Sequence, residues 1–166
     1  MTGRRTLPTV ADTRAFGQAL AARLHAGDLV LLAGPLGAGK TVLAQGIGAG
    51  LGVAGPITSP TFVIARVHRP DPARGGTVPM VHVDAYRLGT AADPRAEVDD
   101  LDLDAVTGES VTVVEWGEGM VEQLAEAHLL VRIDRPGEDE ARVVELVGRG
   151  GDWSRRLAGG PPWPAR

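Results

Sequence analysis

Residues 34–41 read GPLGAGKT and match the pattern G-x-x-x-x-G-K-[ST] at every fixed position. Glycines in such a loop let successive backbone N–H groups turn inward and bind an anion. Lys40 can neutralise phosphate oxygens, and the hydroxyl of Thr41 can bind Mg²⁺. The residues before the loop, 28–33 (DLVLLA), have the continuous apolar pattern of a buried strand, and residues 40–51 predict a helix. This strand–loop–helix context predicts a phosphate-binding P-loop.

The segments on either side of the loop predict further strands and a further helix. Residues 13–25 carry apolar side chains at four-residue spacing, which predicts an amphipathic helix with Asp12 as its N-cap and Gly27 after its end. Strands are predicted, in chain order, at residues 62–68, 78–84, 111–115, 129–133 and 143–147. The first two of these should pair as neighbours, and the last two should pair across a Pro-Gly turn. This order of elements predicts an α/β sheet of the P-loop type.

The length and composition indicate one domain without metal–thiolate or disulfide chemistry. A chain of 166 residues fits one domain, which we place at residues 1–148, and contains no cysteine. Residues 149–166 are rich in glycine and proline and predict a loosely ordered C-terminal tail. No apolar segment follows the first arginines, and the longest apolar run, residues 29–36, is far shorter than a bilayer span. We therefore expect a cytoplasmic protein without a membrane segment.

The charge balance bears on possible partners. The chain has 17 basic and 21 acidic residues and a formal net charge of −4, which argues against direct binding of nucleic acid through a basic surface. An RNA-related role would then act through a partner protein. Of the 17 basic residues only Lys40 is a lysine. A compact ammonium group is kept at the one position where the motif requires it.

Two carboxylates follow apolar strand candidates, which places them where a nucleotide-binding sheet needs them. Asp84 ends the strand at residues 78–84, and Glu115 ends the strand at residues 111–115. The carboxyl ends of strands in an open α/β sheet face the ligand crevice, so both side chains are candidates to reach a metal ion or the γ-phosphate. The alternative is that each is an ordinary polar residue closing a strand.

Other polar and aromatic residues allow two interpretations. Residues 59–62 (SPTF) lie between the P-loop helix and the next strand, where many P-loop proteins carry a hydroxyl that senses the γ-phosphate, but they also fit a simple turn. His82 and Tyr86, taken alone, are more typical of packing residues than of reactive ones. Trp116 fits either the core or an aromatic surface for a partner.

The motifs together resemble those of the TsaE (YjeE) family. GPLGAGKT at 34–41, SPTF at 59–62, HVDAYR at 82–87 and EW at 115–116 stand in that family's order and spacing. The H-x-D-x-Y-R motif with a downstream E-W is specific to the family, whereas the P-loop is not. The resemblance covers roughly residues 9–147. The family supplies the ATPase for bacterial synthesis of threonylcarbamoyladenosine in tRNA.

The resemblance implies a fold, a reaction and partners. The fold is an α/β single P-loop NTPase-type domain, with a mixed central β-sheet and helices on both faces. The protein would bind ATP and Mg²⁺ and hydrolyse ATP weakly alone. TsaD and TsaB would be its partners and would stimulate hydrolysis. Contact with tRNA would be indirect, through that complex, and the isolated protein is expected to be a monomer.

The resemblance also implies roles for individual residues. Asp84, Lys40 and Glu115 form the expected catalytic set, with Asp84 needed for hydrolysis. Thr41 and Glu115 are the expected metal ligands. Thr61 would belong to a switch-like segment that senses the γ-phosphate. The expected nucleotide-binding residues are Gly37, Ala38, Gly39, Lys40, Thr41, Val42, Thr13, Thr61 and Arg142.

The chain departs from the family pattern at a few positions. The family usually has an acidic residue where Pro35 stands and a second hydroxyl where Val42 stands. A basic residue that contacts nucleotide is often found near Asp139, so Arg142 is the substitute assigned here. Residues 97–105 lack an expected glycine and aromatic pair. These departures concern the adenine and partner contacts and leave the phosphate-binding residues intact.

Three alternative functions compete with an ATPase. A small P-loop kinase acting on a small molecule or nucleotide needs an arginine-bearing lid, for which residues 69–74 are the candidate. A regulatory GTP switch needs a guanine-specificity element such as N-K-x-D, which cannot occur because Lys40 is the only lysine. A scaffold that binds nucleotide without turnover is the third. Measuring ATP turnover with and without TsaD and TsaB would separate these functions.

Overall fold

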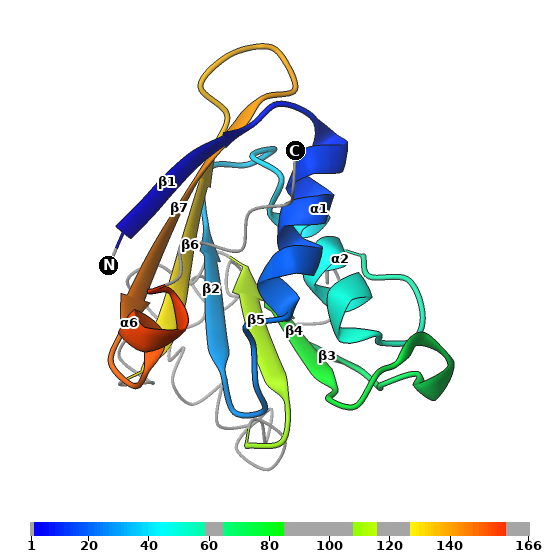
Figure 1. Cartoon of the computed structure of the whole chain (residues 1–166). Coiled ribbons are helices and arrows are strands. Elements are labelled where there is room, and N and C mark those ends of the chain that lie inside the picture. Colours follow the sequence, from blue (N-terminus) through cyan, green and yellow to red (C-terminus); the bar gives the residue numbers. More distant parts are fainter. Residues whose placement is uncertain (1, 59–64, 85–107, 116–126, 159–166) are drawn as a thin grey trace, which may run out of the picture.

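The computed structural model describes residues 2–58, 65–84, 108–115 and 127–158, and these residues build a seven-stranded sheet. The strands are β1 (Thr2–Leu7), β2 (Leu29–Ala33), β3 (Ala65–His68), β4 (Met80–Asp84), β5 (Val111–Glu115), β6 (His128–Asp134) and β7 (Arg142–Arg149). They lie in the order β1-β7-β6-β2-β5-β4-β3 (Figure 1). The central pairs β6–β2, β2–β5 and β5–β4 are parallel, and the outer pairs β1–β7, β7–β6 and β4–β3 are antiparallel. The predicted α/β fold with a mixed central sheet is confirmed.

The helices of the described residues lie on one face of this sheet. They are α1 (Val10–Ala21), α2 (Lys40–Leu51) and the short α6 (Trp153–Arg156), with a 3₁₀ turn, η1 (Pro72–Arg74). Val30 and Leu32 of β2 face the main core, together with Phe16 of α1 and Leu43 of α2. Alternate residues such as Leu31 face the opposite side, as the two-residue period of a strand requires. Among the described residues, no helix is long and apolar enough to cross a membrane.

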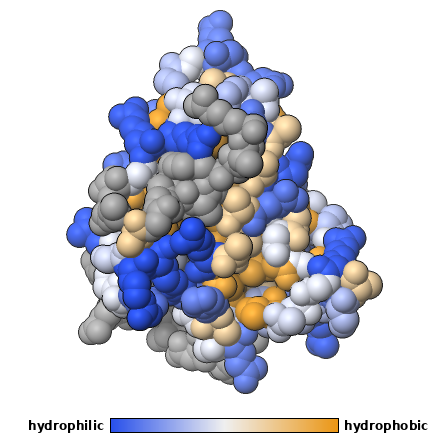
Figure 2. Space-filling model, viewed as in Figure 1, coloured by the Kyte–Doolittle hydropathy of each residue, from blue (hydrophilic) through white to orange (hydrophobic). Residues whose placement is uncertain are grey.

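The space-filling view shows the surface of the same side of the molecule. Hydrophilic residues cover most of the coloured surface, and an apolar area lies in its lower part (Figure 2). The large apolar side chains of α1 and α2 are instead buried between the helices and the sheet. The two helices are therefore held to the sheet by a continuous apolar core.

Helices α1 and α2 pack backbone against backbone through glycines. A Cβ atom on Gly17 of α1 would lie 2.6 Å from the carbonyl oxygen of Leu43 in α2. A Cβ atom on Gly46 of α2 would collide with the carbonyl oxygen of Arg14 in α1. Gly50 is enclosed in the same way. Glycine is unfavourable inside a helix by about 1 kcal/mol relative to alanine, and here the close approach of the two helices requires it.

The predicted element boundaries hold best around the P-loop. Helix α2 and strand β5 have the predicted bounds, and α2 is followed by the C-cap residue Gly52, whose φ of 71° suits glycine. The predicted pairs β3–β4 and β6–β7 are both antiparallel neighbours. Of the predicted strand at residues 62–68, residues 62–64 lie outside the described part of the chain.

The prediction of Asp12 as the N-cap of the first helix was wrong. Thr9 is the N-cap, and it forms a capping box with Asp12, the third helical residue. The backbone N–H of Asp12 donates to Thr9 Oγ1 at 3.1 Å, and the backbone N–H of Thr9 donates to Asp12 Oδ2 at 3.0 Å. The predicted end at residue 25 was also wrong, because Arg23 and Leu24 form the tighter i→i−3 bonds of a final turn.

Strand β1 was not predicted, because its sequence TGRRTL lacks the apolar alternation of a half-buried strand. Its backbone pairs with β7 over six residues, from Thr2 opposite Val147 to Leu7 opposite Arg142. Leu7 is its one side chain in the main core. A polar strand at a sheet edge is held by the backbone ladder rather than by burial.

The prediction of a loosely ordered tail from residue 149 was wrong for residues 149–158. Strand β7 continues through Arg149, and Trp153 of α6 is buried against Gly148. Residues 159–166 lie outside the described part of the chain. The prediction relied on a high glycine and proline content, whereas one buried tryptophan is enough to fix the segment to the core.

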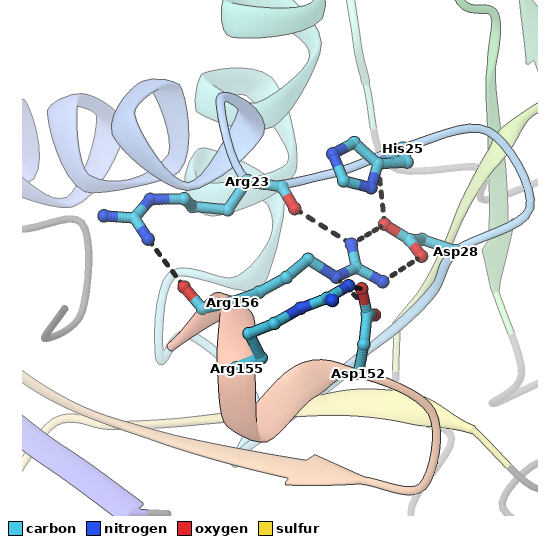
Figure 3. A network of polar contacts seen from close by, with 6 residues as sticks. All are labelled: Arg23, His25, Asp28, Asp152, Arg155 and Arg156. Atoms are coloured by element: carbon cyan, nitrogen blue, oxygen red, sulfur yellow. Dashed lines mark hydrogen bonds and ion pairs between the residues drawn. The ribbon is translucent and has the colours of Figure 1, made fainter. Parts of the chain in front are cut away.

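An ion-pair network clamps α6 to the start of strand β2 (Figure 3). The guanidinium of Arg156 donates twice to the carboxylate of Asp28, at 2.6 and 2.8 Å, and once to Asp152 at 2.8 Å. It also lies 3.9 Å from the ring centroid of Trp153. The hydrogen bonds to Asp28 raise the pKa of Arg156. The side chains of Asp28 and Arg156 are only 10% and 13% exposed, so this pair is largely removed from water.

We expect Arg156→Ala to reduce the free energy of unfolding by about 3 kcal/mol, because it leaves the Asp28 carboxylate buried without its partner. Urea unfolding followed by circular dichroism measures this. Arg155→Ala is the matched control, since Arg155 is 83% exposed and pairs with Asp152 at the surface; its cost should be below about 1 kcal/mol. Equal losses in the two variants would contradict a clamping role for Arg156.

Candidate nucleotide-binding site

The P-loop connects the end of β2 to the start of α2 with a backbone that only glycine adopts easily. Gly37 and Gly39 have φ angles of 77° and 106°, in the left-handed region. A Cβ atom on Gly34 would collide with the carbonyl oxygen of Ile133 in β6. Gly39 is the N-cap of α2 and provides no side-chain cap, so the amides of the first helical turn are left for another acceptor. With the positive end of the helix dipole, they form an anion-binding site.

Lys40 spans this loop. Its Nζ donates to the carbonyl oxygens of Gly34 at 2.6 Å and of Pro35 at 3.1 Å. Burial lowers the pKa of Lys40, and the negative charges of Glu115 and Asp84 partly oppose this shift. The ammonium group is therefore held partly out of water, within the field of two carboxylates.

The parallel register of β4 and β5 places Asp84 directly opposite Glu115. Residues that are paired in this way project from the same side of the sheet, and here it is the side that packs against α2. The structure thus brings together Asp84, Lys40 and Glu115, which the sequence predicted as the catalytic set. The carboxyl ends of β2, β4 and β5 meet at one edge of the sheet, as expected for a parallel core.

The two predicted metal ligands are in direct contact. Thr41 Oγ1 donates to Glu115 Oε1 at 3.1 Å, and Glu115 is only 5% exposed. A buried carboxylate and a hydroxyl at the start of α2 are hard oxygen donors of the kind that Mg²⁺ prefers. Their position beside the phosphate-binding loop fits a magnesium ion that also takes oxygen ligands from phosphates.

Two further predicted nucleotide-binding residues, Thr13 and Arg142, lie beside Gly39 of the loop. A Cβ atom on Gly39 would lie 3.4 Å from Arg142 Nε and 3.9 Å from Thr13 Cγ2. Arg142 is largely buried, and its NH1 donates to backbone carbonyls, the shortest bond being 2.9 Å to Glu140. The start of α1 and the start of β7 therefore meet at the P-loop, near the upper end of the sheet (Figure 1).

The other predicted nucleotide-binding residues belong to the loop itself, to the first turn of α2, or to segments outside the described part of the chain. Gly37 is exposed in the loop, and Val42 is half-buried in the first turn of α2. Ala38 is buried, and its backbone N–H donates to Pro35 within the loop at 3.1 Å. Thr61, with residues 59–62, lies outside the described part of the chain, as do Tyr86 and Trp116.

His82 is a site residue that sequence reasoning treated as packing. Its side chain is fully buried, and its Nε2 lies 3.3 Å from Glu115 Oε1. The signal in the sequence is its spacing from Asp84. Two residues apart on one strand, the two side chains project from the same face of the sheet. If Asp84 faces the site, His82 must lie on the same side.

Proteins of one family are similar to this chain over most of its length. The family model for the threonylcarbamoyl adenosine biosynthesis protein TsaE matches residues 7–144. The TsaE protein of Mycobacterium tuberculosis strain H37Rv is 54% identical over 144 residues, which cover 86% of this chain and 84% of that protein. The Streptomyces coelicolor TsaE protein is 56% identical, covering 85% of this chain and 93% of the relative.

A more distant relative and a solved structure extend the similarity. The Bacillus subtilis TsaE protein is 36% identical over 80% of this chain and 78% of the relative. The crystal structure of Bacillus subtilis YdiB superposes with a TM-score of 0.75 at 26% identity, covering 96% of this chain and 93% of that one. The resemblance inferred from the sequence motifs is confirmed. The chain belongs to the TsaE family of threonylcarbamoyl adenosine biosynthesis proteins.

Proposed function

We propose that this protein is the Mg²⁺-dependent ATP-binding and ATP-hydrolysing subunit required for threonylcarbamoyladenosine modification of tRNA, acting with TsaD and TsaB. The observation that carries the proposal is the grouping of Lys40, Thr41, Glu115 and Asp84 around a complete P-loop. Membership of the TsaE family supports the pathway. The net charge of −4 favours contact with tRNA through the partners rather than through this chain.

Different residues around the loop are assigned to the phosphates, the metal ion and the nucleoside. Burial removes part of the hydration of the Lys40 ammonium, which lowers its pKa, and negative phosphate oxygens would stabilise its positive charge in place of that hydration. Thr41 and Glu115 hold the magnesium ion, which neutralises charge on the phosphates when bound. We assign Thr13 and Arg142 to the nucleoside side of the site, because they lie beside Gly39 rather than beside Glu115.

The hydrolytic step needs an oriented water molecule and compensation of the charge that develops on the phosphates. Asp84 is the carboxylate next to Glu115 in the register of β4 and β5, and we assign it to orient this water and accept its proton. Arg142 lies beside Gly39, on the nucleoside side of the site, and is not assigned to the phosphates. We therefore expect TsaD and TsaB, or closure of the segment around Thr61, to complete the site, so that hydrolysis is slow in the isolated protein.

A small P-loop kinase is the alternative function for the same loop and metal site. A kinase transfers the γ-phosphoryl group to an acceptor, whereas an ATPase releases inorganic phosphate. Measuring phosphate release with and without TsaD and TsaB therefore tests the proposal. Release that the partners accelerate supports an ATPase, and release that does not respond to them contradicts the proposed coupling.

We expect Lys40→Ala to abolish measurable ATP binding, and Lys40→Arg to weaken it at least about tenfold. The charge-assisted hydrogen bonds of a compact ammonium, each worth more than about 1.5 kcal/mol, cannot be reproduced by a planar guanidinium. Isothermal titration calorimetry measures the affinity. Arg155→Lys, an exchange of the same two residue types at an exposed position on α6, is the control and should bind normally. Near-normal affinity in Lys40→Arg would contradict the role given to the ammonium.

We expect Glu115→Ala to weaken ATP binding in the presence of Mg²⁺ more than in its absence, because its role is to hold the metal ion. Titrations at several Mg²⁺ concentrations and in EDTA measure both affinities. Glu145→Ala, which removes a carboxylate on β7 that pairs with Arg132, is the control and should not alter the Mg²⁺ dependence. An equal loss with and without metal would mean that Glu115 has only a structural role.

We expect Asp84→Ala to retain ATP binding and association with TsaD and TsaB while reducing ATP turnover and tRNA modification about 100-fold or more, since it removes the proton acceptor. Phosphate release and tRNA modification in the reconstituted complex measure this. Asp134→Ala is the control, because Asp134 ends β6 at the same edge of the sheet but on the face that carries Leu130. Turnover at the wild-type rate in Asp84→Ala would exclude the mechanism.

A further inference from the structure

The imidazole of His82 lies in a place where an apolar side chain would be expected. His82 is in the middle of β4 and is 0% exposed, and the strand around it is apolar, with Met80, Val81 and Val83 all in the core. Neither ring nitrogen forms a hydrogen bond within the described residues. A buried polar group left in this state costs about 1–3 kcal/mol. Such a group calls for an explanation beyond packing.

Among the described residues, the carboxylate of Glu115 lies close to this ring. His82 Nε2 lies 3.3 Å from Glu115 Oε1, just outside good hydrogen-bond geometry. The same oxygen accepts a hydrogen bond from the hydroxyl of Thr41 at 3.1 Å. Two polar groups therefore approach Oε1 from two elements, Thr41 from α2 and His82 from β4. The carboxylate lies between the P-loop helix and the sheet.

Thr41 cannot be the only anchor of this carboxylate if the proposed function is correct. Its hydroxyl is also assigned to the metal ion, so the bond to Glu115 competes with that role. His82 has no other partner among the described residues. A neutral imidazole carries one N–H, and with the proton on Nε2 it has the donor that a fixed carboxylate needs.

We propose that His82 is a positioning residue, whose Nε2–H donates to Glu115 Oε1 and holds the carboxylate in the orientation in which it binds Mg²⁺. The inference rests on the proposed function, because it concerns the ion that Glu115 holds. The 3.3 Å separation is close to hydrogen-bond length, so the bond requires a better angle between the two groups rather than a new contact. Partners that orient a metal ligand typically change metal affinity 10- to 100-fold.

The chain offers a matched control in a second buried histidine. His68 lies on β3, opposite Met80 in the register with β4, and is 5% exposed. Its Nε2 also has no hydrogen-bond partner among the described residues. No contact between His68 and Glu115 is found in the described part of the chain. Replacing His68 therefore repeats the loss of a buried imidazole without touching the carboxylate.

The experiment compares His82→Met, His82→Gln and His68→Met in the full chain. Methionine fills the space without a donor, whereas the glutamine amide nitrogen takes the place of Nε2. Calorimetry measures ATP affinity in EDTA and over a range of Mg²⁺ concentrations, and thermal unfolding measures stability. We expect His82→Met to need about tenfold more Mg²⁺ for the same gain in ATP affinity, with binding in EDTA unchanged within about twofold. His82→Gln should retain most of the Mg²⁺ response, and His68→Met should leave that response unchanged, whatever its effect on the unfolding temperature.

A double-mutant cycle separates positioning from packing. If His82 acts through Glu115, the combined loss in His82→Met with Glu115→Gln should be smaller than the product of the two separate losses. A wild-type Mg²⁺ response in His82→Met, or independent losses in the cycle, would overturn the proposal. If His82→Met does not fold, His82→Asn replaces it, because its shorter amide cannot reach the position of Nε2. A wild-type protein that binds ATP equally well with and without Mg²⁺ would overturn the proposed function as well, which distinguishes the two failures.

Discussion

Helices α1 and α2 touch along their backbones, and the arrangement of the nucleotide-binding residues depends on this contact. With Gly17 and Gly46 at the crossing, no side chain separates the two helices. The start of α1 can then approach the start of α2 closely enough to bring Thr13 beside Gly39. A larger residue at either glycine would push the helices apart, because packed backbone atoms cannot yield. The glycines weaken the intrinsic helix propensity of α2, and this cost is offset by the burial that the close packing allows.

The parallel centre of the sheet is the second constraint. Because β2, β5 and β4 run in the same direction, the P-loop and the carboxylates at the ends of the next two strands meet at one edge. The register then sets Asp84 opposite Glu115, and the helix start sets Thr41 over the Glu115 carboxylate. Glu115 and His82 of this cluster are buried, and a buried carboxylate is expensive without partners. Lys40, Thr41 and His82 are the groups around these carboxylates that reduce this cost.

Strand β2 is restrained at both ends. At its carboxyl end the chain turns directly into the P-loop, and the contact of Gly34 with β6 leaves no room for a side chain. At its amino end Asp28 is held by the buried guanidinium of Arg156. The clamp joins residues 128 positions apart in the chain, so it fixes the C-terminal helix and the P-loop strand to each other. The precision of the phosphate site depends on a rigid strand beneath it.

The sequence alone determined the strand–loop–helix unit, because local rules control it. The glycines at 37 and 39, Lys40 and Thr41 are specified by the backbone angles and the charges that phosphate binding requires. Buried strands such as β5 are recognisable from a continuous apolar run, and the order of the motifs was enough to indicate the family. The tertiary structure decided what depends on residues far apart in the chain. It made an ordered strand of the polar β1, clamped α6 through Arg156, and placed His82 against Glu115. These features depend on contacts between residues far apart in the chain. A local pattern does not show that a polar segment pairs as an edge strand, that an arginine reaches a distant carboxylate, or which residue a buried histidine contacts.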